Sequence, residues 1–346
     1  MAASAVVRSF ASDNHAGAAP EILAAIAEAN EGHAPAYGAD SWTERAERCF
    51  RDAFGEQARA FPVWGGTAAN VLSIRASCRA WEGVACSEVA HIDVNEAGAP
   101  ERIAGVKLFP LPAPNGKLRP EQLEPLTVSA GDEHAVQLRL VSVTQASELG
   151  TSYSPAELGE LCERAHDLDL LVHLDGARLG NAAAHLGVPL RALTTDVGVD
   201  VISFGGTKLG AVGAEAVVFL REELAADFRF LRKQTAQLAS KQRFVSAQLA
   251  ALLTDELWLR LATHANAMAS RLASGAGAVP GVRITHAVES NQVFATLPPR
   301  ALAPLQARWP FYVWDRARAE VRWVCSWDTR AEEVDELIAA LAELCA

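Results

Sequence analysis

Lysine is scarce in this chain of 346 residues: it has five lysines, so 26 of its 31 basic residues are arginines. Acidic residues number 42, and the formal net charge of −11 argues against a binding surface for nucleic acid or an anionic membrane. No apolar run approaches the roughly 18 residues of a membrane-spanning helix. The first residues, MAASAVVRSFASDNHAG, lack the apolar core of a signal peptide, so the sequence predicts a cytoplasmic protein.

Cysteine and histidine are present but not grouped. The six cysteines contain no C-x-x-C pair, which favours reduced thiols with structural roles in a cytosolic protein. The nine histidines show no H-E-x-x-H or comparable spacing, so the sequence predicts no metal site.

Between about residues 55 and 220, short apolar runs alternate with amphipathic stretches of helical length. The segments ARAFPVWGG, VACSEVAHI, RLVSVTQ, LLVHLD, VDVISFGG and EAVVFL each have the length and composition of a strand. SPAELGELCERAHDLDL predicts a helix, with Ser154 as the N-cap and Pro155 at the first helical position. Apolar strands separated by helices indicate an α/β fold with a mostly parallel sheet covered on both faces.

After Leu220 the sequence becomes a long helical stretch, and a glycine- and proline-rich break follows at residues 275–281. Short strand-like segments (VRITHAV, QVFATL, FYVW and EVRWVCSW) and the amphipathic helix RAEEVDELIAALAELC complete the chain. We therefore expect an N-terminal segment (1–40) that contributes to the site, a large domain (41–245) and a smaller α+β C-terminal domain (246–346).

Three predicted strand ends carry residues that suggest a ligand site, because open parallel sheets bind ligands at the carboxyl ends of their strands. Gly65-Gly66-Thr67 precedes a predicted helix whose N-terminus offers free N–H groups to an anion. Asp175 ends the strand LLVHLD, where it either caps a helix or pairs with Arg178, or else meets a cationic ligand.

The third strand end carries Lys208, the lysine of VISFGGTKLG, whose neighbours are apolar residues, glycines and hydroxyls. A buried amine has a lowered pKa and is a nucleophile. A P-loop reading fails because Thr207 precedes the lysine and Leu209 follows it, and no G-x-G-x-x-G follows a strand.

Together the three strand ends match the requirements of pyridoxal phosphate. This cofactor needs a lysine for covalent attachment, a carboxylate beside its pyridine nitrogen, and a helix N-terminus with hydroxyls for its phosphate. Asp175 lies 33 residues before Lys208 on the preceding strand, so both side chains can face one ring. Ser203, Thr207 and the helix start at Gly66 and Thr67 can face the phosphate.

The order of motifs along nearly the whole chain resembles that of low-specificity L-threonine aldolases. The motifs are FASDNHAG, YGADSWTERAE, GGTAAN, EVAH with EAGAPE, TQASELGT, HLDGARLGNA, SFGGTKLG, KQTAQLASKQRF and VRWVCSWDT. The resemblance implies the aspartate-aminotransferase-like fold (fold type I) of pyridoxal phosphate enzymes. It also implies a homotetramer of two dimers, with active sites at the subunit interface.

The resemblance also implies roles for individual residues. Lys208 would attach the cofactor, Asp175 would pair with the pyridine nitrogen, and His91 would stack on the ring. The phosphate would be held by Gly66, Thr67 and Thr207, and by Arg243 from a neighbouring subunit. The substrate carboxylate would be bound by Arg178, Arg322 and Ser12, and Arg178 would also contact the cofactor. Tyr37 belongs to a segment that lines the site. Arg322 favours an anion site independently, because it interrupts the apolar strand VRWVCSW.

One departure from the family concerns the base that takes the β-hydroxyl proton. Many threonine aldolases have a histidine in an E-N-T-H-N-G-like segment, where this chain has TQASELG. His91, Glu148, His33 or a water molecule remain candidates, with His91 preferred. The expected reaction is retro-aldol cleavage of L-threonine, L-allo-threonine or L-phenylserine to glycine and an aldehyde. The alternative is a β-eliminating lyase or an aminotransferase of the same fold.

Overall fold

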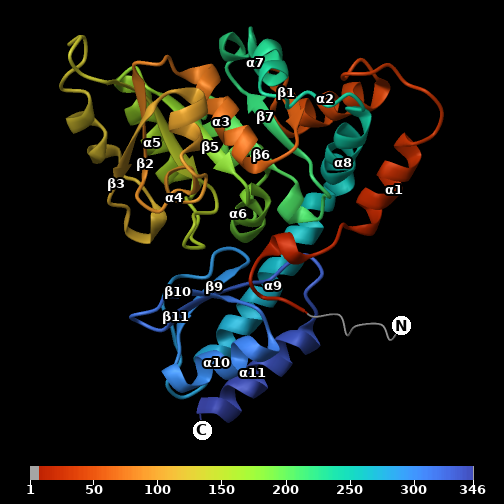
Figure 1. Cartoon of the computed structure of the whole chain (residues 1–346), viewed down its shortest axis with the longest axis vertical. Coiled ribbons are helices and arrows are strands. Elements are labelled where there is room, and N and C mark those ends of the chain that lie inside the picture. Colours follow the sequence, from red (N-terminus) through yellow and green to blue (C-terminus); the bar gives the residue numbers. More distant parts are fainter. Residues whose placement is uncertain (1–7, 346) are drawn as a thin grey trace.

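The computed structural model describes residues 8–345, so the first seven residues of the predicted cytoplasmic start lie outside the described residues. Figure 1 shows a large α/β unit in its upper half and a smaller unit, which holds the C-terminus, in its lower half. Within residues 8–345 we find no helix whose length and apolar character would let it cross a membrane.

The large unit is built on a seven-stranded sheet with the order β1-β7-β6-β5-β4-β2-β3. Neighbouring strands from β6 to β3 run parallel, whereas β7 is antiparallel to both β6 and β1. The strands are β1 (Arg59–Val63), β2 (Glu82–Ser87), β3 (Lys107–Leu111), β4 (Gln137–Thr144), β5 (Leu171–Gly176), β6 (Val201–Gly205) and β7 (Glu215–Phe219). The predicted mostly parallel sheet is confirmed, and β3 joins one edge of it as a strand that the sequence did not reveal.

The large unit also contains helices, several of which pack against its sheet while the first packs against the last. They are α1 (Pro20–Ala29), α2 (Ser41–Phe54), α3 (Gly66–Ser77), α4 (His91–Val94), α5 (Pro155–Asp167), α6 (Leu179–Leu186), α7 (Phe228–Gln234) and α8 (Arg243–Leu253). Helix α5 begins as predicted: the Ser154 hydroxyl accepts the N–H of Glu157, and the Glu157 carboxylate accepts the N–H of Ser154. His91 begins α4 rather than continuing β2, which ends at Ser87.

The smaller unit contains a four-stranded antiparallel sheet with the order β10-β11-β9-β8. Its elements are β8 (Arg283–Ile284), β9 (Gln292–Thr296), α10 (Pro299–Arg308), β10 (Tyr312–Asp315), β11 (Glu320–Val324) and α11 (Ala331–Cys345). All four predicted strand segments contain a strand, and the predicted terminal helix is α11.

Helix α9 (Leu257–Gly277) links the two units, and Figure 1 shows it running from one to the other. Its first half, with Leu261 and Ala262, packs into the core of the large unit. Its second half, with Ala269 and Leu272, packs into the core of the smaller unit, which also includes Phe10 from the N-terminal segment. The two cores therefore share one continuous helix.

Candidate functional site

A cavity of about 320 Å³ lies where β1, β5 and β6 end. Eight of the residues predicted from the sequence line it together: Gly65, Gly66, Thr67, His91, Asp175, Ser203, Thr207 and Lys208. Residues that the sequence analysis did not assign to the site, including Asn14, Trp64, Val212 and Glu215, complete the lining. Tertiary structure thus collects side chains from six separate segments around one space.

Lys208 lies in the short 3-10 turn η8 (Thr207–Leu209), which follows β6 directly. Burial lowers the pKa of its amine, and the nearby Arg178 guanidinium lowers that pKa further, whereas the carboxylates of Asp13, Asp175 and Glu215 oppose the shift. A lowered pKa increases the fraction of uncharged amine, which is the nucleophilic form.

Two glycines allow the turn before Lys208 to pack closely. A Cβ on Gly205 would lie 2.7 Å from Cα of Ala177, and a Cβ on Gly206 would lie 2.4 Å from the carbonyl oxygen of Ala214. Both distances are too short for any side chain, so the approach of β6 to its neighbours requires glycine at both positions.

Asp175 is the next-to-last residue of β5, and two donors hold its carboxylate. Oδ1 accepts the N–H of Ala177 at 3.0 Å, and Oδ2 accepts the side-chain amide of Asn70 at 2.8 Å. The same amide nitrogen donates to Oε1 of Glu96 at 2.8 Å, and this oxygen lies 2.8 Å from Nδ1 of His91. A chain of polar contacts therefore connects Asp175 to His91 through two buried residues.

Asn70 and Glu96 were missed by the sequence analysis as functional residues. Both belong to motifs that carry the family resemblance, GGTAAN and EAGAPE, but neither follows a strand, so the strand-end argument could not identify them. The pairing with Glu96 holds the His91 ring by Nδ1 and leaves Nε2 available to another partner.

Helix α3 begins at the cavity. Its N-cap, Gly65, provides no side-chain acceptor, so the first N–H groups of the helix have no side-chain partner there. A Cβ on Gly65 or Gly66 would meet no atom within 4 Å. The helix start therefore faces open space that suits an anion.

The hydroxyls near Lys208 already have partners within the protein. The Thr207 hydroxyl donates to the Glu215 carboxylate, and the Ser203 hydroxyl lies 2.8 Å from Nε2 of His173 and 3.2 Å from the Ser73 hydroxyl. His173 is fully buried, which lowers its pKa to about 4 and keeps it neutral.

Arg178 forms a buried, two-contact ion pair with Asp13. Nε donates to Oδ2 at 2.8 Å and a terminal nitrogen donates to Oδ1 at 3.0 Å. Burial would raise the pKa of Asp13, but Arg178, Lys208 and a hydrogen bond from Asn291 together lower it. The N-terminal segment thereby places a carboxylate beside Lys208, and the Ser12 hydroxyl accepts the N–H of Asn14 in the same turn.

Arg322 lies on β11, on the side of the smaller unit that contacts the N-terminal segment. Its Nε atom is buried and has no hydrogen-bond partner among residues 8–345. Burial, followed by the charge of Arg178, lowers its pKa to about 10. The guanidinium carbon lies 5.4 Å from the ring centre of Tyr312 and 5.2 Å from that of Trp314. An unpartnered guanidinium nitrogen beside a second arginine is suited to an anionic ligand.

The Glu148 side chain contacts the backbone of His91. Its Oε1 accepts the N–H of His91 and the hydroxyl of Thr144, both at 2.8 Å. Burial raises the pKa of Glu148, and the charge of Asp175 raises it further, while Oε2 has no partner within residues 8–345. Glu148 therefore favours its protonated form more than an ordinary glutamate does.

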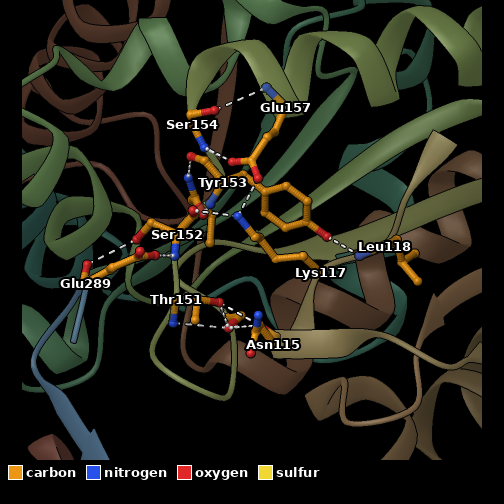
Figure 2. A network of polar contacts seen from close by, with 11 residues as sticks. Asn115, Lys117, Leu118, Thr151, Ser152, Tyr153, Ser154, Glu157 and Glu289 are labelled. Atoms are coloured by element: carbon orange, nitrogen blue, oxygen red, sulfur yellow. Dashed lines mark hydrogen bonds and ion pairs between the residues drawn. The ribbon is translucent and has the colours of Figure 1, made fainter. Parts of the chain in front are cut away.

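The loop that carries Glu148 is anchored by polar contacts, which Figure 2 shows. Lys117 donates to Glu157 at 2.6 Å, and the Tyr153 hydroxyl accepts the N–H of Leu118 at 2.6 Å. The N–H of Ser152 donates to Glu289 of the smaller unit at 2.7 Å. Both units of the chain thus hold this loop in place.

Tyr37 and Arg243 do not line this cavity. The N–H of Tyr37 donates to the Ser240 carbonyl, and the Arg243 guanidinium lies near the carbonyl of Gly32. The two residues therefore lie on one surface formed by the segments around residues 32–37 and 240–243. Their predicted site roles require a second subunit and stay predictions.

The donor set fits pyridoxal phosphate. The cavity offers one amine with a lowered pKa, one carboxylate held by two donors, and one helix N-terminus that opens onto free space. These are the groups that bind the aldehyde, the pyridine nitrogen and the phosphate of this cofactor.

Comparison with known proteins agrees with this geometry. The model of the beta-eliminating lyase family matches residues 9–298. A low specificity L-threonine aldolase of Pseudomonas aeruginosa is 44% identical over 330 residues, which cover 95% of each chain. The solved structure of a Leishmania major threonine aldolase matches with a TM-score of 0.93 and 30% identity, covering 98% of this chain and 100% of that one. The structure of Oryza sativa TDC with PLP and tryptamine shares the fold at a TM-score of 0.76 and 14% identity, over 95% of this chain and 82% of that one.

Proposed function

Because this chain belongs to the beta-eliminating lyase family and has the fold type I architecture, we propose that it cleaves L-β-hydroxy-α-amino acids. The products are glycine and an aldehyde, which for L-threonine is acetaldehyde. One observation carries the proposal: Lys208, Asp175 and the start of α3 line a single cavity in a chain similar to threonine aldolases along 95% of its length.

Pyridoxal phosphate, when bound, supplies the electron sink that accepts the electron pair of the broken Cα–Cβ bond. Lys208 would attach the cofactor, and its lowered pKa makes the uncharged amine available. Asp175 would bind the pyridine nitrogen, with its carboxylate oriented by Asn70 and the N–H of Ala177. The first N–H groups of α3 would bind the phosphate.

Arg322 would bind the substrate carboxylate through its unpartnered Nε, with Arg178 beside it. Arg178 is already committed to Asp13, so its function in this site is to hold the N-terminal turn and to add positive charge. A fixed carboxylate restricts rotation of the substrate and thereby orients its Cα–Cβ bond.

His91 would accept the β-hydroxyl proton at Nε2. Glu96 holds the opposite ring nitrogen, as a carboxylate does in catalytic histidine pairs. Glu148 is the second candidate for the base: its Oε1 is occupied by the N–H of His91 and the hydroxyl of Thr144, whereas its Oε2 has no partner within residues 8–345.

We further propose a homotetramer of two dimers in which Arg243 and Tyr37 complete a neighbouring site. The proposal is supported by apolar side chains that remain uncovered near the cavity: Trp64 and Val212 line it, yet are 49% and 61% exposed. Phe230 is exposed as well, at 59%. The cytoplasmic location and the domain limits at residues 40 and 245 stay predictions.

The test is an assay of the purified protein with pyridoxal phosphate and L-threonine, L-allo-threonine or L-phenylserine. We expect equal amounts of glycine and aldehyde. Lys208→Ala should abolish cleavage, and Lys107→Ala, which changes an exposed lysine on β3, should leave it unchanged. Release of ammonia and a keto acid in place of glycine would show β-elimination and would refute the proposal.

A further inference from the structure

Glu215 is a buried acidic residue of the cavity to which the proposed mechanism gives no task. It is the first residue of β7, with 6% of its surface exposed. In the sheet it pairs with Gly205 of β6 on one side and with Val63 of β1 on the other. Glu215 therefore lies between the strand that leads to Lys208 and the strand that leads to α3.

The Glu215 carboxylate binds the turn that carries Lys208. Its Oε2 accepts the N–H of Gly206 at 2.9 Å, and both the N–H and the hydroxyl of Thr207 also donate to the carboxylate. The N-cap of the η8 turn, Gly206, has no side chain to perform this task. A residue of the neighbouring strand thus caps the turn from outside.

Glu215 also contributes to the electrostatics around the Lys208 amine. The charged groups that face this amine are Arg178, Asp13, Asp175 and Glu215. Asp13 is paired with Arg178, and Asp175 is held by Asn70 and the N–H of Ala177. Glu215 differs from these two carboxylates because it is bonded to the turn that carries Lys208.

We propose that Glu215 is a positioning residue for Lys208. Glu215 holds the 206–209 turn in place, and its charge sets the protonation state of the Lys208 nitrogen. The inference rests on the proposed function, in which Lys208 attaches pyridoxal phosphate. An anionic Glu215 stabilises the cationic form of this nitrogen and so raises its pKa. Burial raises the pKa of Glu215 itself to about 7, so its charge changes in the neutral range. Lys208 is the charged group that acts on Glu215.

The experiment is a pH titration of the visible absorbance of the lysine-bound cofactor in the loaded protein. Glu215→Gln keeps the shape and removes the charge, and we expect its midpoint to lie about one pH unit below that of the wild type. Glu333→Gln, which neutralises a buried carboxylate in α11 of the smaller unit, should titrate like the wild type. A Glu215→Gln protein that is folded and loaded but has the wild-type midpoint would overturn the electrostatic part of the proposal.

Glu215→Asp tests the charge separately from the contact to the N–H of Gly206. It also keeps the proposal testable if Glu215→Gln does not fold. Aspartate keeps the charge, but its carboxylate is one methylene shorter and loses the contact to the N–H of Gly206. We expect a midpoint within a few tenths of a unit of the wild type and an affinity for pyridoxal phosphate that is about tenfold weaker. Unchanged affinity would overturn the positioning part. If the wild type showed no absorbance that depends on Lys208, the proposed function would fail first, and this inference with it.

Discussion

At the scale of single residues, the site brings several buried charged groups together around one amine. Asp13, Asp175 and Glu215 surround Lys208 and Arg178, and each of the three carboxylates has at least one named donor. Burying a charge is costly unless it is paired, so this arrangement persists because nearly every group has a partner. Among the buried atoms without a partner in residues 8–345, Nε of Arg322 is a cationic donor, and a substrate carboxylate would satisfy it.

His173 leads to a prediction about acid stability. The folded protein binds its proton only near pH 4, whereas an unfolded histidine binds it near pH 6.5. The unfolded state therefore takes up the proton first as the pH falls, so stability is complete above about pH 6.5 and declines towards pH 4. The contribution of this one group reaches about 3 kcal/mol.

Urea unfolding at about pH 7.5 and about pH 5 measures this effect. We expect His173→Gln to be less stable than the wild type at both values, because Ser142 and Ser203 lose a partner. Its loss of stability between the two pH values should nevertheless be smaller than that of the wild type. His134→Gln, at an exposed position, should keep the wild-type slope. Equal slopes in all three proteins would contradict the assignment.

At the scale of elements, the site is made by the ends of three strands and by the short turns that follow them. β1 leads into α3, β5 leads to the N-cap of α6, and β6 leads into the turn with Lys208. Parallel strands end at the same edge of the sheet, so residues distant in sequence meet there. Glycines at two of these turns are needed for different reasons. Gly206 leaves room for the packed Ala214 carbonyl, and Gly66 leaves open the space predicted for the phosphate.

Substitution of these glycines by alanine should therefore affect different properties: folding stability for Gly206 and cofactor binding for Gly66. Gly206→Ala brings a Cβ against the Ala214 carbonyl, and we expect unfolding to become easier by about 1–3 kcal/mol. Gly66→Ala meets no protein atom, so its stability should stay within about 0.5 kcal/mol of the wild type. Its Cβ would instead occupy the space predicted for the phosphate and weaken cofactor binding about tenfold.

Urea unfolding and a fluorescence titration with pyridoxal phosphate distinguish the two variants. Pyridoxal, which lacks the phosphate, is the matched ligand and should bind Gly66→Ala and the wild type equally. If Gly66→Ala bound pyridoxal phosphate as tightly as the wild type, the start of α3 would not be the phosphate site.

At the scale of the whole molecule, two cores share the helix α9, and the site draws on both of them. The large unit provides Lys208 and Asp175, and the smaller unit provides Arg322 and the Glu289 contact to the loop of Glu148. The N-terminal segment adds Asp13 beside Lys208. Trp64 and Val212 remain exposed at this place, which favours burial against another copy of the chain.

Mixing two impaired variants tests the shared site. Arg243→Ala should weaken cofactor binding, because its guanidinium is proposed to reach the neighbouring phosphate, and Lys208→Ala should be inactive. Subunits exchanged between the two variants form mixed dimers in which one of the two sites has both residues intact. For random pairing, about a quarter of all sites should then be functional.

The measurement is the cleavage rate after the two proteins have been unfolded and refolded together at equal concentration. Each variant refolded alone provides the control, and a mixture of the two without refolding shows the background. Activity equal to the sum of the separate variants would mean that Arg243 acts within its own chain or not at all.

The sequence by itself determined the elements whose signals are local. The apolar runs predicted β1, β4, β5, β6 and β7, and the capping pattern at Ser154 and Pro155 predicted the start of α5. It also indicated Lys208 and Asp175, since a charged residue after an apolar strand stands out without any tertiary information. The direction in which neighbouring strands pair could not be predicted from the sequence. β7 runs antiparallel to β6, but the composition of a strand does not show whether its neighbour runs parallel or antiparallel to it.

Only the tertiary structure decided which residues complete the site. Asn70 meets Asp175 across 105 positions and Asp13 meets Arg178 across 165, and neither separation follows a periodicity that a sequence reveals. The partners of Lys208 likewise come from the N-terminal turn at Asp13–His15, from β5 and from β7, which packing alone brings together. The physical reason is that helical and strand patterns record the burial of a side chain, whereas the identity of its neighbour depends on how the elements are arranged in space.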